Sequence, residues 1–332
     1  MIPQSPPQPY TRQGSPRRVG VEIEFAGMLP QDAAQLVNTL FGGEIETLSP
    51  HRLRVVDTRW GDFAIELDAQ YAHPDSKIIG NLPQDKDESG RNPMRVELHN
   101  RTREWIGDVV AGLVPTEIVC PPVPWNELGD LDALFNALRD QGAKGTDASL
   151  LYGFGLHLNP EVPSTEVSSL LAHLRAYLLL AEWLRDQIDI DITREVLPHA
   201  NPFPKAYGIK VLDPAYDPSL EVLIDDYLEY NNSRNRELDL LPLFAHLCPD
   251  HHHSGLQDEL IKPRPTFHYR LPNAQLSSSD WGAVIEWNRW LEVERLAADS
   301  ACLEARSREY LDYHTQSPMS RWLDKLRGWM KE

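Results

Sequence analysis

The chain has 332 residues, of which 41% are hydrophobic and 25% are charged, and its formal net charge is −18 at pH 7. This composition is typical of a folded globular protein and excludes a disordered chain. The acidic surplus disfavours attraction to nucleic acid or to an anionic membrane surface, so we expect neither as a partner. The cysteines Cys120, Cys248 and Cys302 are far apart in the sequence, which favours a reducing compartment, and we expect the cytoplasm.

Three regions follow one another along the chain. Residues 1–17 are rich in proline and glutamine, which predicts a disordered or loosely attached leader. A folded domain is expected over residues 18–298, followed by a helical extension over residues 299–332. Residues 75–93 are polar and predict a surface excursion, and residues 198–218 form a connection rich in proline and aromatic residues.

Periodicity predicts alternating strands and helices within the domain. Apolar and polar residues alternate with a period of two in the segments expected to be strands: 18–25, 63–68, 95–99, 117–119, 152–159 and 266–271. Apolar residues recur at helical spacing in the segments 31–41, 101–113, 128–141, 165–188, 221–230 and 280–298. Each strand keeps one polar face, whereas parallel strands covered on both sides would be almost wholly apolar. The sequence therefore predicts an α+β fold in which helices pack against an antiparallel sheet.

The first strand carries two carboxylates on one face. Glu22 and Glu24 alternate with apolar residues, and side chains two apart in a strand point the same way. A single Glu-x-Glu pair most often marks a face in contact with water. The acidic alternation recurs, however, and an imidazole and an amide follow it, in the segments Glu66-Leu67-Asp68, Glu117-Ile118-Val119 and His157-Leu158-Asn159. Clustered carboxylates repel one another unless cations neutralise them, and such oxygen-rich sites suit Mg²⁺ or Mn²⁺.

Basic residues gather in the second half of the chain. Their positive charges would complement the charge of phosphate groups. These residues are Lys205, Lys210, Arg234, Arg236, Lys262, Arg264 and Arg270. Arginine suits two-point contacts with phosphate, and lysine acts as a point charge. Each of these residues alone is more often a solvated surface cation. Arg264, His268 and Arg270 share a face if the strand at residues 266–271 extends back to residue 264 without interruption.

These motifs resemble those of the amidoligase family, within the superfamily of glutamine synthetase and glutamate–cysteine ligase. Residues 19–25 resemble the first-strand signature of the family. The segments Glu117-Ile118-Val119-Cys120-Pro121 and Gly155-Leu156-His157-Leu158-Asn159 follow in the order that the family shows.

The resemblance implies a curved, glutamine-synthetase-like antiparallel sheet around ATP and two or three divalent ions, Mg²⁺ or Mn²⁺. A carboxylate substrate would be activated as an acyl phosphate and captured by an amine, each on a small molecule or a peptide. The implied metal ligands are Glu22, Glu24, Glu66, Asp68, Glu117 and His157, with the choice between Glu66 and Asp68 left open. Catalytic contacts to phosphate are expected from His157, Arg264 and Arg270. Contacts to the nucleotide are expected from Lys210, Arg234, Arg236, Lys262 and Asn273.

The last motif departs from the family pattern. The superfamily often has an acid-x-Arg pair on its last active-site strand, whereas the candidate strand here contains Tyr269-Arg270-Leu271. Glu286 and Arg289 are spaced three apart in an expected helix, and Glu97 with His99 offers another source of ligands. The third metal site therefore stays open.

Two other functions compete with the ligase. The same carboxylates and His157 could activate water in a metal-dependent hydrolase, or the fold could serve a noncatalytic binding protein. No P-loop or dinucleotide fingerprint occurs in the sequence. The three histidines at residues 251–253 lie in an expected loop without the spacing of zinc motifs, which favours a structural or incidental role.

Overall fold

The computed structural model describes residues 1–67, 115–146, 154–188, 200–231, 234–258, 260–316 and 329. Several expectations lie outside these residues: Asp68, Glu97 and His99, the excursion at residues 75–93, the strand at 95–99 and the helix at 101–113.

One antiparallel sheet organises the described part of the chain. Its strand order is β2-β3-β4-β5-β1-β7-β9-β8, and β6 pairs with β1 beside this path. The strands are β1 (Arg18–Phe25), β2 (Glu44–Ser49), β3 (Arg52–Thr58), β4 (Gly61–Leu67), β5 (Thr116–Val119), β6 (Val123–Pro124), β7 (Leu156–Pro160), β8 (Leu238–Asp239) and β9 (His268–Tyr269). All pairings between these strands are antiparallel. The predicted α+β class is confirmed.

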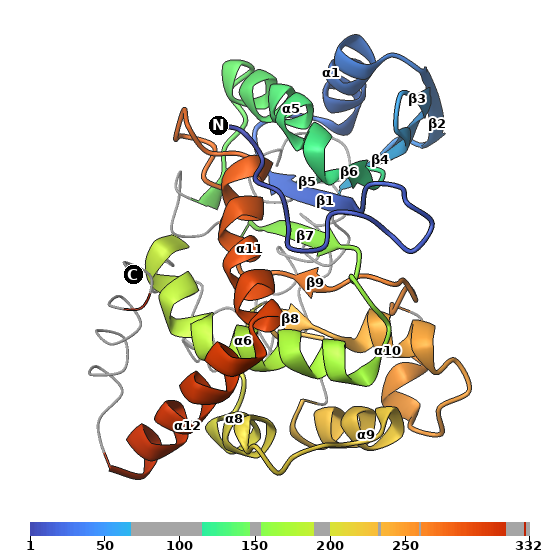
Figure 1. Ribbon diagram of the computed structural model, residues 1–332. Helices are drawn as coiled ribbons and strands as arrows, with labels where there is room; N and C mark the ends of the chain where they lie inside the picture. Colours follow the sequence, from blue (N-terminus) through green and yellow to red (C-terminus); the bar gives the residue numbers. More distant parts are fainter. Residues whose placement is uncertain are drawn as a thin grey trace, which may run out of the picture.

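Helices occupy much of the rest of the described chain. They are α1 (Pro30–Phe41), α5 (Leu128–Asp140), α6 (Val167–Ile188), α8 (Lys205–Leu212), α9 (Leu220–Tyr230), α10 (Leu241–Leu247), α11 (Ala283–Ala298) and α12 (Ser300–Gln316), with the 3₁₀ turns η1 (Trp125–Glu127) and η3 (Ser254–Leu256). Figure 1 shows α11 passing beside β1, β7 and β9, with α6 and α12 below it. No helix in the described ranges is long and apolar enough to cross a bilayer.

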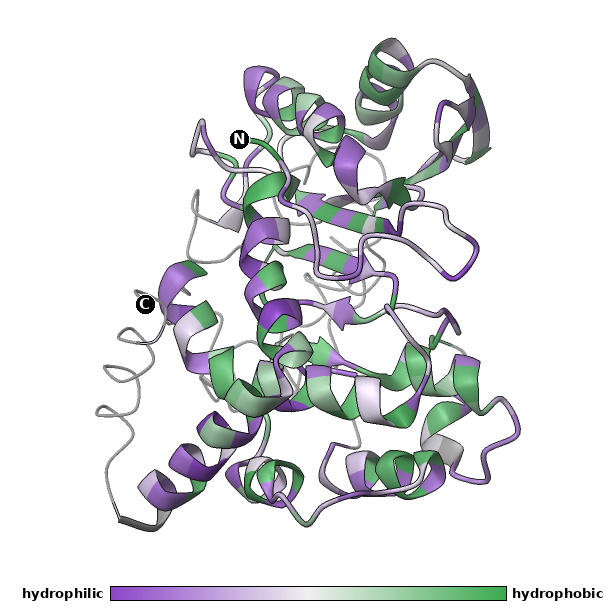
Figure 2. Ribbon diagram, in the orientation of Figure 1, coloured by the Kyte–Doolittle hydropathy of each residue, from purple (hydrophilic) through white to green (hydrophobic). Residues whose placement is uncertain are grey.

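The apolar face of the central strands forms the core. Val21 and Ile23 of β1 are fully buried, and Figure 2 shows the alternation of hydrophobic and hydrophilic residues along β1 and β7. Trp290 of α11 packs on Phe267 and Tyr269, with 5.3 Å between ring centroids in each pair. Since side chains alternate along a strand, the neighbours of these apolar residues point to the opposite face, away from α11.

The structure contains elements that periodicity did not indicate. β2 and β3 form a hairpin. Every residue of β2 is exposed, so neither face of this strand has to be apolar and its sequence need not alternate between apolar and polar residues. α8 lies within the expected connection at residues 198–218, and α10 was not predicted. The strand expected over residues 266–271 is reduced to β9, and Pro265 and Pro272 lie on either side of the expected segment.

The leader contacts the domain at several points. Arg17 and Glu294 of α11 form a buried ion pair at 2.6 Å. The indole N–H of Trp287 donates to the carbonyl of Gln4 at 3.0 Å, and that of Trp125 donates to the carbonyl of Pro9 at 3.0 Å. These contacts attach residues 1–17, expected from composition to be loose, to α11 and to η1.

Candidate active site

The strand register gathers polar side chains on the face opposite α11. Glu22 of β1 lies opposite His157 of β7, and Glu24 lies opposite Glu117 of β5. Glu117 in turn lies opposite Glu66 of β4. Residues directly opposite in an antiparallel pair are neighbours on the same face. The recurring acidic alternation in the sequence therefore corresponds to two neighbouring rows on one face of the sheet, Glu22 with His157 and Glu24 with Glu117 and Glu66.

Glu22 is at the centre of a bonded group. Its Oε2 lies 3.1 Å from Nδ1 of His157, and its Oε1 accepts a hydrogen bond of 2.9 Å from the amide of Asn159. The guanidinium of Arg264 donates to Oδ1 of Asn159 at 2.8 Å and lies 3.7 Å from Oε1 of Glu22. Gly20 is opposite Asn159, and a Cβ there would lie 3.2 Å from the Cβ of Asn159, so the glycine leaves room for this side chain.

These partners hold the Glu22 carboxyl in its ionised form. Burial by itself raises the pKa of Glu22, but the hydrogen bond with His157, the charge that His268 carries when it is protonated at low pH, and the charge of Arg264 outweigh it. The resulting pKa is well below the usual range of a glutamate. Glu22 is therefore an anion across the physiological pH range and can bind a cation without first losing a proton.

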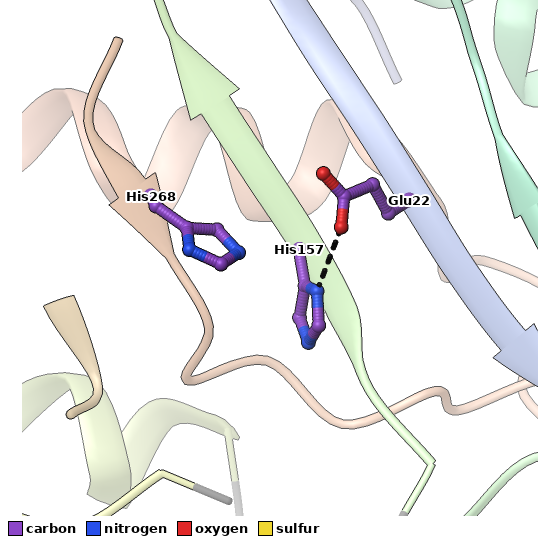
Figure 3. Close-up of side chains that lie close together, drawn as sticks. All are labelled: Glu22, His157 and His268. Carbon is purple, nitrogen blue, oxygen red and sulfur yellow. Dashed lines mark hydrogen bonds and ion pairs between the residues drawn. The ribbon is translucent and has the colours of Figure 1, made fainter. Parts of the chain in front are cut away.

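His268 and Asp239 form a second buried pair beside this group. They are opposite one another in the pairing of β8 with β9, and Nδ1 of His268 lies 3.3 Å from Oδ2 of Asp239. Nε2 of His268 has no hydrogen-bond partner among the described residues. Figure 3 shows the ring of His268 extending toward Glu22 and His157, and the two imidazoles meet edge to face with 5.3 Å between centroids.

Burial is the main cause that lowers the pKa of His268, to about 4, although Asp239 and Glu22 oppose it. The imidazole is therefore neutral at neutral pH. Because the Asp239 carboxylate accepts from Nδ1–H, the lone pair is left on Nε2, the atom that has no partner. Such a carboxylate–imidazole arrangement is common behind metal ligands.

Two groups of side chains could hold a metal ion, and His157 belongs to both. One consists of Glu22, His157 and His268, and the other of Glu24, Glu117 and His157, with one ligand atom per residue and all atoms of a group within 4.8 Å of one another. Oε2 of Glu24 also accepts a hydrogen bond of 2.9 Å from the backbone N–H of Gly155.

Arg234 lies near two further arginines, Arg264 and Arg270. Burial is the first cause that lowers the pKa of the Arg234 guanidinium, and the charges of Arg270 and Arg264 lower it further, while Asp239 opposes them. Arg270 donates from Nη1 to the carbonyl of Arg234 at 2.6 Å. The Nε atoms of Arg234 and Arg270 are buried and have no hydrogen-bond partner in the described residues. Like charges brought together in this way form a ready site for an anion.

The structure places other predicted residues in contacts of their own. Lys210 of α8 pairs with Asp226 of α9 at 2.6 Å. The guanidinium of Arg236 donates to the carbonyls of Pro202 and Tyr230. Their expected contacts with a nucleotide stay predictions.

Three further residues were predicted to contact a metal ion or the nucleotide. Glu66 pairs with Arg52 at 3.0 Å and belongs to neither of the two groups around His157. Asn273 is buried in a bridge with Gly155, and Lys262 is exposed.

Sequence reasoning assigned no individual role to His268 or to Asp239. A signal for His268 was available in the sequence. His268 stands two residues before Arg270, which is the position of the acid in the acid-x-Arg pair that the resemblance implies. The pair Glu286 and Arg289, considered for that place, is bonded within α11 at 2.6 Å, and α11 covers the apolar face of the sheet. Asp239 had no such signal, since only the pairing of β8 with β9 brings it to the site.

Comparisons with known proteins agree with the resemblance. A family model described as "Putative amidoligase enzyme" matches residues 15–292. No curated protein and no solved structure matches the chain. The matched region contains all the residues of the two groups around His157 and the three arginines. The chain belongs to this amidoligase family, and its membership supports a ligase-type function.

Proposed function

We propose that the protein is an ATP-dependent carboxylate–amine ligase that releases ADP and phosphate as it forms an amide bond through an acyl phosphate. One observation carries this proposal. Two sets of possible metal ligands, which have His157 in common, lie on one face of the sheet, next to the cluster of Arg234, Arg264 and Arg270. Family membership supports the ligase part of the proposal. On this proposal the sheet surrounds the nucleotide in the manner of glutamine synthetase.

The donor set fits a divalent cation. Glu22, His157 and His268 would hold one ion, and Glu24 with Glu117 would hold another, with His157 available to either group. Carboxylate oxygens suit Mg²⁺, and the imidazoles make Mn²⁺ an alternative. A bound divalent ion neutralises phosphate charge and orients phosphate oxygens. The unpartnered Nε2 of His268 supports this reading, because a buried nitrogen without a partner costs free energy unless a ligand satisfies it.

The arginines would bind the phosphate groups. Arg264 is positioned by Asn159, which also bonds to Glu22, so a shift of the guanidinium would also disturb the central carboxylate. Arg234 and Arg270 extend the positive charge on the side of β8 and β9. Planar guanidinium groups bind phosphate oxygens at two points and stabilise the charge that develops in phosphoryl transfer.

The substrates are a carboxylic acid and an amine, each free or on a peptide. A phosphate-release screen with pooled acids and amines in the presence of Mg²⁺ and ATP tests the proposal, and mass spectrometry identifies the product. We expect phosphate release to require the acid, the amine, Mg²⁺ and ATP together. We expect the mass of the product to equal the mass of the acid plus that of the amine minus that of water. Turnover without nucleotide would support a hydrolase instead. Binding of Mg-ATP without phosphate release under any pool would support a noncatalytic protein.

A further inference from the structure

Three side chains meet at a second place, away from the central strands. His251 and His252 lie in the loop between α10 and η3, and their rings stack with 4.6 Å between centroids. Both rings reach the carboxylate of Asp225, which lies on α9. Figure 1 shows α9 and the segment after α10 in the lower part of the molecule, apart from β1 and β7. The sequence favoured a structural or incidental role for these histidines, because they lie in a loop without the one-face spacing of zinc motifs.

The distances in this cluster differ from those of hydrogen bonds. Nε2 of His251 lies 3.5 Å from Oδ1 of Asp225, and Nε2 of His252 lies 3.7 Å from the same oxygen. A hydrogen bond from nitrogen to oxygen spans about 2.7–3.2 Å. Ligand atoms at the corners of a tetrahedron around zinc lie roughly 3.3 Å apart when each bond is about 2.0–2.1 Å. The two separations are therefore closer to those across a metal ion than to those of direct bonds.

Burial supplies an independent argument. The side chain of His251 is only 3% exposed, and its Nε2 has no hydrogen-bond partner among the described residues. A buried nitrogen left without a partner costs roughly 1–3 kcal/mol. Asp225 is 46% exposed and His252 is 78% exposed, so an ion can enter from solvent and keep a water molecule in the remaining position.

We propose that Asp225, His251 and His252 form a binding site for Zn²⁺ that connects α9 to the loop after α10. Two imidazoles and one carboxylate are ligands that zinc accepts, whereas Mg²⁺ prefers a set of oxygens. Nδ1 of His251 accepts a long hydrogen bond of 3.3 Å from the backbone N–H of His253. Binding of zinc at Nε2 leaves the proton on Nδ1, so this contact opens when the ion binds.

The test is a competition titration of the metal-free full-length protein with Zn²⁺ against a chromophoric chelator. His252→Ala removes an exposed ligand, and Asp225→Asn removes the shared carboxylate. His246→Ala is the control, since His246 is an exposed histidine on α10 that does not belong to the cluster. We expect the wild-type protein and the control to bind one more equivalent of zinc than His252→Ala.

The affinity of this extra equivalent should fall more than about 10-fold in Asp225→Asn, because even residues that only support a metal ligand contribute 10–100-fold. Zn²⁺ should also raise the melting temperature of the control more than that of His252→Ala. Both variants keep the ligands of the sheet, so zinc bound there is common to all samples. Equal stoichiometry and affinity in the wild-type protein and His252→Ala would overturn the proposal.

Discussion

The buried ion pair between Arg17 and Glu294 offers a sharp test of how the leader is attached. The two side chains are 1% and 2% exposed, and both oxygens of Glu294 accept hydrogen bonds from Arg17. Trp290 donates a further hydrogen bond of 2.9 Å to Glu294. Replacing Arg17 with methionine keeps most of the buried volume but leaves the carboxylate with the indole N–H of Trp290 as its remaining hydrogen-bond donor among the described residues.

Removing one partner of a buried pair typically costs 3–5 kcal/mol, because the other charge stays desolvated. We therefore expect Arg17→Met to lower the free energy of unfolding by about 3–5 kcal/mol. The matched control is Arg12→Met, since Arg12 pairs with Glu166 at 3.4 Å while the two side chains are 72% and 70% exposed. Such a surface pair contributes about 0–1 kcal/mol.

Equilibrium unfolding in urea measures both variants. We expect the midpoint of unfolding to move to a lower urea concentration in Arg17→Met and to stay near that of the wild-type protein in Arg12→Met. Equal, small losses in the two variants would show that the leader does not bury this ion pair in solution, and the reasoning would fail.

Three further predictions concern the site and the pH dependence of stability. Asn159→Leu removes a hydrogen bond to the Glu22 carboxylate, and we expect kcat/KM of the ligase reaction to fall about 10–100-fold, since such a bond contributes about 1.5–3 kcal/mol; an unchanged value would contradict this. Asp239→Asn should weaken Mn²⁺ binding about 10–100-fold in calorimetry, because the carboxylate that orients His268 is lost. Burial raises the pKa of Asp132 to about 6, above its value of about 4 in the unfolded chain. The protonated carboxyl therefore contributes its full share of stability below about pH 4, and this share is lost as the pH rises to about 6, because only the unfolded chain releases the proton easily in that range. Asp132→Asn should therefore remove roughly 1–3 kcal/mol of pH dependence from urea titrations in that range, and an unaltered pH profile would refute the assignment.

The sequence predicted those parts of the fold that depend on local patterns. The alternation in β1 indicated both the strand and the common face of Glu22 and Glu24, and burial in the structure confirms the alternation. β2 could not be found in this way, since all its residues are exposed and its sequence has no reason to alternate.

The site was harder to predict, because it depends on contacts between distant segments. Asp239 reaches His268 through the pairing of two short strands, which no local pattern indicates. Positive charge alone did not separate Arg264, which bonds within the site, from Lys210, which pairs with a carboxylate of α9. Likewise, the meeting of His251 with α9 follows from packing and not from the spacing of the histidines.

Calorimetric titration of Mg-ATP into the wild-type protein and Glu22→Gln tests the central claim most directly. The matched control is Glu46→Gln, because Glu46 lies on the exposed strand β2 and its side chain is 51% exposed. We expect the wild-type protein and the control to bind Mg-ATP equally, and we expect Glu22→Gln to bind it more than about 10-fold more weakly, since it loses the central anion of the site. Absence of binding by the wild-type protein, or equal affinity in all three proteins, would contradict a metal–nucleotide site on this sheet.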